Sequence, residues 1–259
     1  HTRDRRQRQM CIRDRAVAAL LGYKTRKDFF IFVFLYLIIS AAVIIFWIYF
    51  SVIALILFIL MSIVHFGLCD WSYLGLKKYK WSVSLTHGLN IVFGIIFFHT
   101  NETFEIFTFL SNLSFNQFQE YLYIVYICYF FLLIRYAYLA IKFTKLRLGI
   151  LEMSIILLVI FLTEPLVAFS IYFCFIHTFK HVKSILKDTS KYLSNNKFIT
   201  ITTISFTILT WVGGSLAIIY LHKSFSFDES FIKTLFIGLA ALTLPHMTLV
   251  DIFYRRKFN

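Results

Sequence analysis

The sequence predicts an all-α fold, a polytopic membrane helix bundle of about eight transmembrane helices. Hydrophobic residues make up 59% of the 259 positions and charged residues only 15%, which is typical of membrane proteins. Residues 29–69 contain no charged side chain. Because one crossing takes about 20 residues, this stretch must hold two helices. Basic residues gather in alternate loops, as expected when a chain crosses a membrane repeatedly.

Eight apolar spans can be placed in order between the loops. Their predicted limits are 29–47, 50–69, 82–99, 119–141, 149–163, 165–184, 198–220 and 231–252. A tight turn near 49–51 separates the first two spans. A second short turn ends at Pro165, which suits the first turn of a helix. We expect residues 16–259 to form a single transmembrane helical domain.

Residues 1–15 differ from the rest of the chain. They are strongly basic and have no hydrophobic period. We interpret 1–15 as a non-native-looking arm, such as a translated assembly scar. The alternative is a genuine basic arm that touches anionic lipid headgroups.

The loop charges predict the orientation of the helices. The loops on one side carry 17 Lys and Arg residues, and the alternate loops carry two. The positive-inside rule then places both termini in the cytoplasm, with the bundle in the cell's inner (plasma) membrane. Six of the 26 Lys and Arg residues behind the net charge of +13 lie in residues 1–15, and most others lie in these loops and not along a stripe, so we exclude nucleic acid as a partner. The four cysteines form no CxxC motif, and we interpret them as reduced packing residues.

Histidines cluster at the cytoplasmic level of the predicted bundle. His177 and His181 are spaced i, i+4, which places both imidazoles on one face of a helix. His65, His87 and His246 fall at the same depth on three other spans. Imidazoles that converge at one level of a bundle can bind a metal ion. The alternative is that each histidine, taken alone, is only a polar residue at the end of a membrane helix.

The types of candidate ligand argue against one class of metalloenzyme but do not identify the metal. No HExxH motif occurs, which argues against a zinc protease. Asp70 is either a hydrogen-bonding partner of a ligand or only a charge at a helix end. Iron, copper and zinc all suit neutral imidazoles. Pro245, inside the last span, should deprive the carbonyl of Ala241 of its usual donor and kink the helix, which could turn His246 inward.

Four motifs follow one another over roughly residues 16–255. They are Ser62-Ile63-Val64-His65-Phe66-Gly67 followed by Asp70; His87-Gly88 followed by Phe98-His99 and Glu102; Glu164-Pro165-Leu166-Val167 through Tyr172-Phe173 to His177-Thr178-Phe179-Lys180-His181; and Pro245-His246-Met247. Together, and in this order, they resemble the bacteriorhodopsin-related (Brp/Blh) family of membrane β-carotene 15,15′-dioxygenases.

The resemblance implies cleavage of β-carotene at its central double bond with O2, giving two retinals. It implies an Fe(2+) cofactor, with His65, His177 and His181 at the family's iron-ligand positions. His246, His87 and Asp70 are possible additional ligands or partners of ligands. The substrate would enter from the lipid phase. The family's earlier Pro-His-Gly-x-x-Asp motif is missing here, so we expect a preceding segment that carries a fourth ligand.

Two other functions stay open at this stage. A membrane di-iron desaturase or hydroxylase would use several histidine boxes, including HxxHH, which this chain lacks. A histidine-lined metal or proton transporter would need polar residues across the whole bilayer. The middle of the spans holds mainly Ile, Leu, Phe and Val, which favours a site at one end, fed from lipid.

Overall fold

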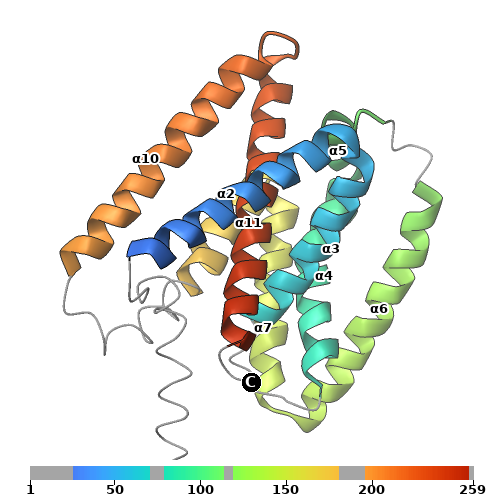
Figure 1. The fold of residues 1–259 in the computed structure, drawn as a ribbon. Coiled ribbons are helices and arrows are strands. Elements are labelled where there is room, and N and C mark those ends of the chain that lie inside the picture. The colour runs from blue at the N-terminus through green and yellow to red at the C-terminus, as the bar shows by residue number, and fades with distance from the viewer. Residues whose placement is uncertain (1–25, 71–78, 114–118, 181–195, 257–259) are drawn as a thin grey trace, which may run out of the picture. The chain divides into compact units, whose positions relative to one another are not determined.

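A computed structural model describes residues 26–70, 79–113, 119–180 and 196–256, and these residues are helical throughout apart from short turns (Figure 1). The predicted all-α class is therefore confirmed. In chain order the helices are α2 (Arg26–Tyr49), α3 (Ser51–Asp70), α4 (Lys80–Phe98), α5 (Thr100–Ser111), α6 (Gln119–Lys142), α7 (Lys145–Leu162), α8 (Pro165–Ile171), the π-helix η3 (Tyr172–His177), α10 (Asn196–Leu221) and α11 (Phe227–Arg256). Residues 1–15 lie outside the described residues.

Several of these helices suit a membrane. Among the described residues, four are long and apolar enough to cross one: Ser51–Asp70, Lys80–Phe98, Tyr123–Lys142 and Phe227–Met247. Shorter apolar helices cover Val33–Tyr49, Pro165–Lys180 and Thr207–Leu221. Large apolar side chains are exposed along most of these helices, as expected where the surrounding solvent is hydrocarbon.

One helix was not predicted. The stretch after the third predicted span was assigned to a loop, but residues 100–111 form α5. The chain breaks at His99, whose φ of −134° and ψ of 53° are not helical, and α5 ends at Asn112 in the left-handed conformation. A helix of 12 residues is about 18 Å long, which is too short for a hydrocarbon core of about 30 Å. The predicted number of crossings is therefore unaffected by α5.

The chain forms two compact units, one of residues 1–51 with 183–259 and one of residues 52–182. The single domain predicted for 16–259 stays a prediction. In the unit of residues 52–182, α4 packs against both α6 and α7. Its larger core cluster contains Phe66, Tyr136 and Tyr172 among its buried members. A second cluster joins the C-terminal half of α4 to α5 and α6 through Phe93, Phe104 and others.

Two glycines allow α3 and α4 to touch through their backbones. A Cβ atom added at Gly67 would lie 2.0 Å from the carbonyl oxygen of Ser84. One added at Gly88 would lie 1.9 Å from the carbonyl oxygen of Ile63. Any larger residue would force the helices apart. This close crossing fixes the end of α3 that carries the candidate site.

The unit of residues 1–51 and 183–259 is built on α11, which contacts both α2 and α10. Pro245 lies inside α11 and cannot donate to the carbonyl of Ala241. The Ser40 hydroxyl on α2 donates to that carbonyl at 2.7 Å. The Tyr36 hydroxyl donates to the next carbonyl, that of Leu242, at 2.6 Å. Ser40 therefore supplies the hydrogen bond that the proline removes, and Tyr36 adds a second contact at the next carbonyl.

Candidate functional site

The candidate site begins at the last turn of α3. Asp70 is the final residue of this helix, and only 2% of its surface is exposed. His65 lies one turn earlier and is also buried. The Sγ atom of Cys69 lies 3.6 Å from Nδ1 of His65. A buried carboxylate is costly unless donors surround it, so Asp70 must have partners on other elements.

Those partners come from the π-helix η3. His177 places Nδ1 2.8 Å from Oδ1 and 3.1 Å from Oδ2 of Asp70. The Tyr172 hydroxyl donates a short hydrogen bond to Oδ2 of the same carboxylate. Both side chains are buried. The carboxylate therefore lies between two donors from one short helical segment.

The π-helical geometry explains how two residues five positions apart reach one carboxylate. In an α-helix, five positions rotate about 140° out of register, so the two side chains would diverge. In a π-helix, backbone bonds join residues i and i+5, and such residues lie on the same face. The Thr178 amide donates to the carbonyl of Phe173, which is this wider bond. One extra residue in the turn thus aligns Tyr172 with His177.

Aromatic rings enclose the two histidines. The ring centres of His65 and His177 are 5.2 Å apart, edge to face. Phe66 meets His177 edge to face at 5.0 Å, and Phe173 stacks on it at 5.4 Å. These contacts restrict the rotation of the imidazole and exclude water from one side of it.

Lys180 connects the candidate site to helix α7. Nζ of Lys180 lies 2.9 Å from Oε2 of Glu152 and 3.5 Å from the backbone carbonyl oxygen of Asp70. It is therefore close to the end of α3 and to α7 at once. A positive charge at the end of α3 also complements the partial negative charge there.

The two imidazoles fit a metal ion. A nitrogen ligand lies about 2.1 Å from a divalent ion, so two imidazoles on one tetrahedral ion have ring centres about 5 Å apart. The observed 5.2 Å between His65 and His177 agrees with this spacing. A carboxylate on the second ring nitrogen of a metal-binding histidine is a common arrangement. Among the residues that the structure describes, no group of three or more His, Cys, Asp or Glu side chains is placed to hold a metal ion. The third predicted ligand, His181, lies outside the described residues.

The remaining predicted residues lie elsewhere. His87 is fully buried, with Nε2 2.9 Å from the Tyr136 hydroxyl of α6. A Cβ atom at Gly149 of α7 would meet the same hydroxyl at 2.1 Å, so this glycine makes room for the pair. His246 lies in α11, in the other compact unit. The roles of His87 and His246 as further ligands stay predictions.

A second buried polar group, which the sequence interpretation missed, lies on α4. Asn90 is fully buried and accepts a hydrogen bond from the Tyr129 hydroxyl at 2.7 Å. Its amide donates to the carbonyl of Met153 on α7 at 3.4 Å. The presence of Asn90 in the sequence could have indicated this group, because a side-chain amide inside an apolar span must find hydrogen-bond partners.

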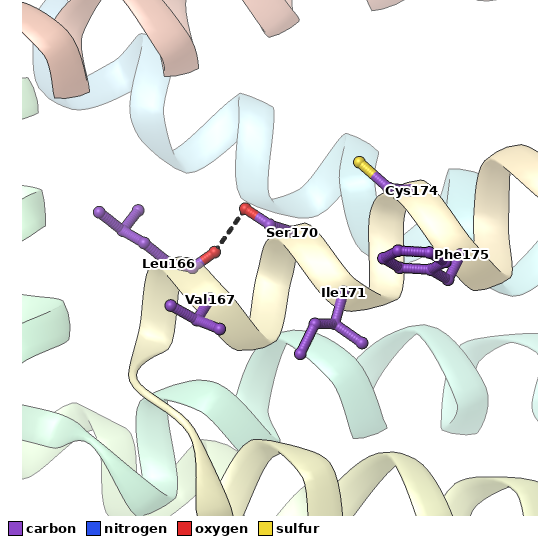
Figure 2. Close-up of a pocket in the computed structure, with 6 residues that line it drawn as sticks. All are labelled: Leu166, Val167, Ser170, Ile171, Cys174 and Phe175. Carbon is purple, nitrogen blue, oxygen red and sulfur yellow. Dashed lines mark hydrogen bonds between the residues drawn. The ribbon is translucent and has the colours of Figure 1, made fainter.

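An apolar pocket of about 270 Å³ lies along α8 and η3 (Figure 2). Figure 2 shows its side chains arranged along the helix in successive turns. The Ser170 hydroxyl donates to the carbonyl of Leu166 at 2.7 Å. The pocket therefore presents mainly apolar surface. Its lining residues are Leu166, Val167, Ser170, Ile171, Cys174 and Phe175.

Three of the four cysteines lie within the described residues. Cys69, Cys128 and Cys174 form no disulfide bond and have exposed side chains, so they are reduced as predicted, but the prediction that they are packing residues is wrong. Their spans are apolar on all sides, and hydrophobic periodicity therefore could not say which face was inward. Cys69 has a different use, since it contacts a candidate ligand.

Fold and site together define a helical membrane protein with a buried histidine–carboxylate cluster at the end of one helix. Comparisons with known proteins identify the family. Residues 13–254 match the family model of β-carotene 15,15′-dioxygenase, so the chain belongs to that family of enzymes. A protein from uncultured marine bacterium 66A03, named β-carotene 15,15′-dioxygenase, is 28% identical over 221 residues, which cover 85% of this chain and 79% of the relative. No solved structure matches the chain.

Proposed function

We propose that this protein cleaves β-carotene at its central double bond with O2 and releases two retinals. The match of residues 13–254 to the family supports the reaction, and so does the name of the marine relative. The structural observation that carries the proposal is the buried pair His65 and His177, with Asp70 on Nδ1 of His177. In the overall reaction the central carbon–carbon double bond breaks and each carbon receives one oxygen atom, so no further reductant is needed.

We propose Fe(2+) as the cofactor, held by His65, His177 and His181. When bound, the iron would supply the activation of O2 for this cleavage. The residues of the chain hold the ligands in place. Asp70 orients the ring of His177, and Phe66 and Phe173 restrict its rotation.

The apolar surroundings of the site suit a substrate that is dissolved in lipid. β-Carotene has no polar group, so only apolar surface can bind it, and the pocket along α8 and η3 offers such surface. From the loop charges we propose that both termini lie in the cytoplasm and that the bundle lies in the inner membrane. The histidine cluster would then face the cytoplasmic half of the bilayer, where a carotenoid can reach it by lateral diffusion.

Expression in a bacterium that makes β-carotene tests the proposed reaction. We expect loss of the orange colour and formation of retinal, measured by chromatography of the extracted pigments. His177→Ala should abolish retinal formation while the protein still inserts into the membrane. His222→Ala is the matched control, because His222 is an exposed histidine directly after the last residue of α10. Wild-type retinal output from His177→Ala would overturn the assignment of this residue.

A further inference from the structure

The last two residues of α3 each contact one of the two candidate ligands. Asp70 lies against Nδ1 of His177, at 2.8 Å. Cys69 lies against Nδ1 of His65, at 3.6 Å. The same ring nitrogen is therefore engaged in both imidazoles, by adjacent residues of one helix.

We propose that Asp70 is a positioning residue, which holds His177 in the tautomer with a proton on Nδ1. Nε2 of His177 is then the nitrogen that binds the metal. This inference rests on the proposed metal site, because it assigns the binding atom of one of the ligands proposed there.

The contacts of Asp70 fix the direction of its hydrogen bonds. An ionised carboxylate only accepts hydrogen bonds. The Tyr172 hydroxyl and Nδ1 of His177 both lie against this carboxylate, so both must donate to it. Neutral His177 with its proton on Nδ1 has the lone pair on Nε2. Tyr172 also holds the carboxylate in the orientation that His177 requires.

The contact of Cys69 does not fix the tautomer of His65. A thiol is a weak donor and its sulfur a weak acceptor, so the contact of 3.6 Å is compatible with a proton on either atom. Cys69 and His65 are also four residues apart on one helix, so their contact does not depend on the packing of another element. We therefore expect His177, and not His65, to be held in one tautomer.

The tautomers can be measured in the metal-free protein. Imidazole nitrogens with and without a proton have well-separated 15N chemical shifts, so histidine labelled with 15N reports the tautomer directly. We expect His177, assigned from the missing signal in His177→Ala, to carry its proton on Nδ1. Asp70→Ala should shift His177 toward a mixture of both tautomers. A wild-type His177 with its proton on Nε2 would overturn the proposal, and this result needs no metal.

Metal affinity gives a second test, with Co(II) as the probe. Loss of a hydrogen-bonding partner of a metal-bound histidine typically weakens binding about 10- to 100-fold. We expect a loss in that range for Asp70→Asn, together with altered cobalt absorption bands. Glu105→Gln, an exposed carboxylate on α5, is the matched control and should bind Co(II) as the wild type does.

The two tests separate the positioning proposal from the proposed function. If the wild-type protein takes up no Co(II) and no iron, the metal centre is wrong, and the tautomer measurement still decides the role of Asp70. If the wild type binds metal and Asp70→Asn binds it equally well, with the same absorption bands, the positioning role is wrong while the metal centre stands. Tyr172→Phe keeps the carboxylate but removes its second donor, so it provides a milder variant should Asp70→Ala fail to fold.

Discussion

Replacement of Gly67 by alanine tests whether the contact between α3 and α4 controls the site. Gly67 lies two residues after His65 and three before Asp70. The added Cβ would lie 2.0 Å from the carbonyl oxygen of Ser84 and 2.7 Å from its carbon. Contacts below 3.0 Å essentially never occur, so the two helices would have to separate by about 1 Å. Backbone atoms cannot rotate away as a flexible side chain could.

The expected cost follows from this overlap. Overpacking of a close contact costs about 1–3 kcal/mol. Alanine recovers about 1 kcal/mol through its better helix propensity, which leaves a net loss of up to about 2 kcal/mol in the free energy of unfolding. The separation also displaces Asp70 from His177, because η3 is held by other contacts in the core. We therefore expect weaker Co(II) binding as well as lower stability.

Unfolding in mixed detergent micelles, followed by circular dichroism, measures the stability. Gly213→Ala in α10 is the matched control, because a Cβ atom there would meet nothing within 4 Å. This control should be neutral or stabilising, by up to about 1 kcal/mol. Equal stability of Gly67→Ala and Gly213→Ala would refute the argument that backbone contact fixes the crossing.

Three further predictions concern other parts of the molecule. Ser40→Ala should lower the free energy of unfolding by about 1 kcal/mol, and the loss should vanish when Pro245 is also replaced by alanine, since the backbone donor is then restored; a thermal unfolding cycle of the four proteins measures this. Tyr136→Phe removes the hydroxyl beside fully buried His87 and should lower the free energy of unfolding by about 1–3 kcal/mol. Unchanged iron content in this variant would argue against His87 as a ligand. A green fluorescent reporter fused after Asn259 should fluoresce and a periplasmic phosphatase there should be inactive, since we expect the C-terminus in the cytoplasm; an active phosphatase would mean an odd number of crossings.

The helices could be predicted because their limits have chemical causes. The span predicted at 50–69 corresponds to α3 (Ser51–Asp70), and the span at 119–141 corresponds to α6 (Gln119–Lys142). Apolar runs bounded by charges or by a proline give these limits directly. Helix α5 was missed because it is too short and too polar to give a membrane signal. Its buried residues pack on the neighbouring helix and not on lipid.

The candidate site was only partly predictable. The sequence placed His65, Asp70 and His177 at one depth, and the structure brings these three together. The sequence left the role of Asp70 undecided, because a carboxylate at a helix end has the same pattern whether or not it contacts a histidine. The contacts of Tyr172 and Lys180 come from tertiary packing, and spacing along the chain does not encode them.

The π-turn shows most clearly what spacing could not reveal. Under α-helical periodicity, Tyr172 and His177 point in directions about 140° apart, and no pattern analysis would join them. The structure inserts one residue into this turn, and both side chains then reach Asp70. A π-turn is less stable than an α-turn and persists where other contacts compensate. Here the compensating contacts are the hydrogen bonds to Asp70, so the carboxylate that orients His177 also stabilises the local geometry that presents it. This mutual dependence explains why loss of Asp70 should affect the metal site more than loss of a single hydrogen bond would suggest.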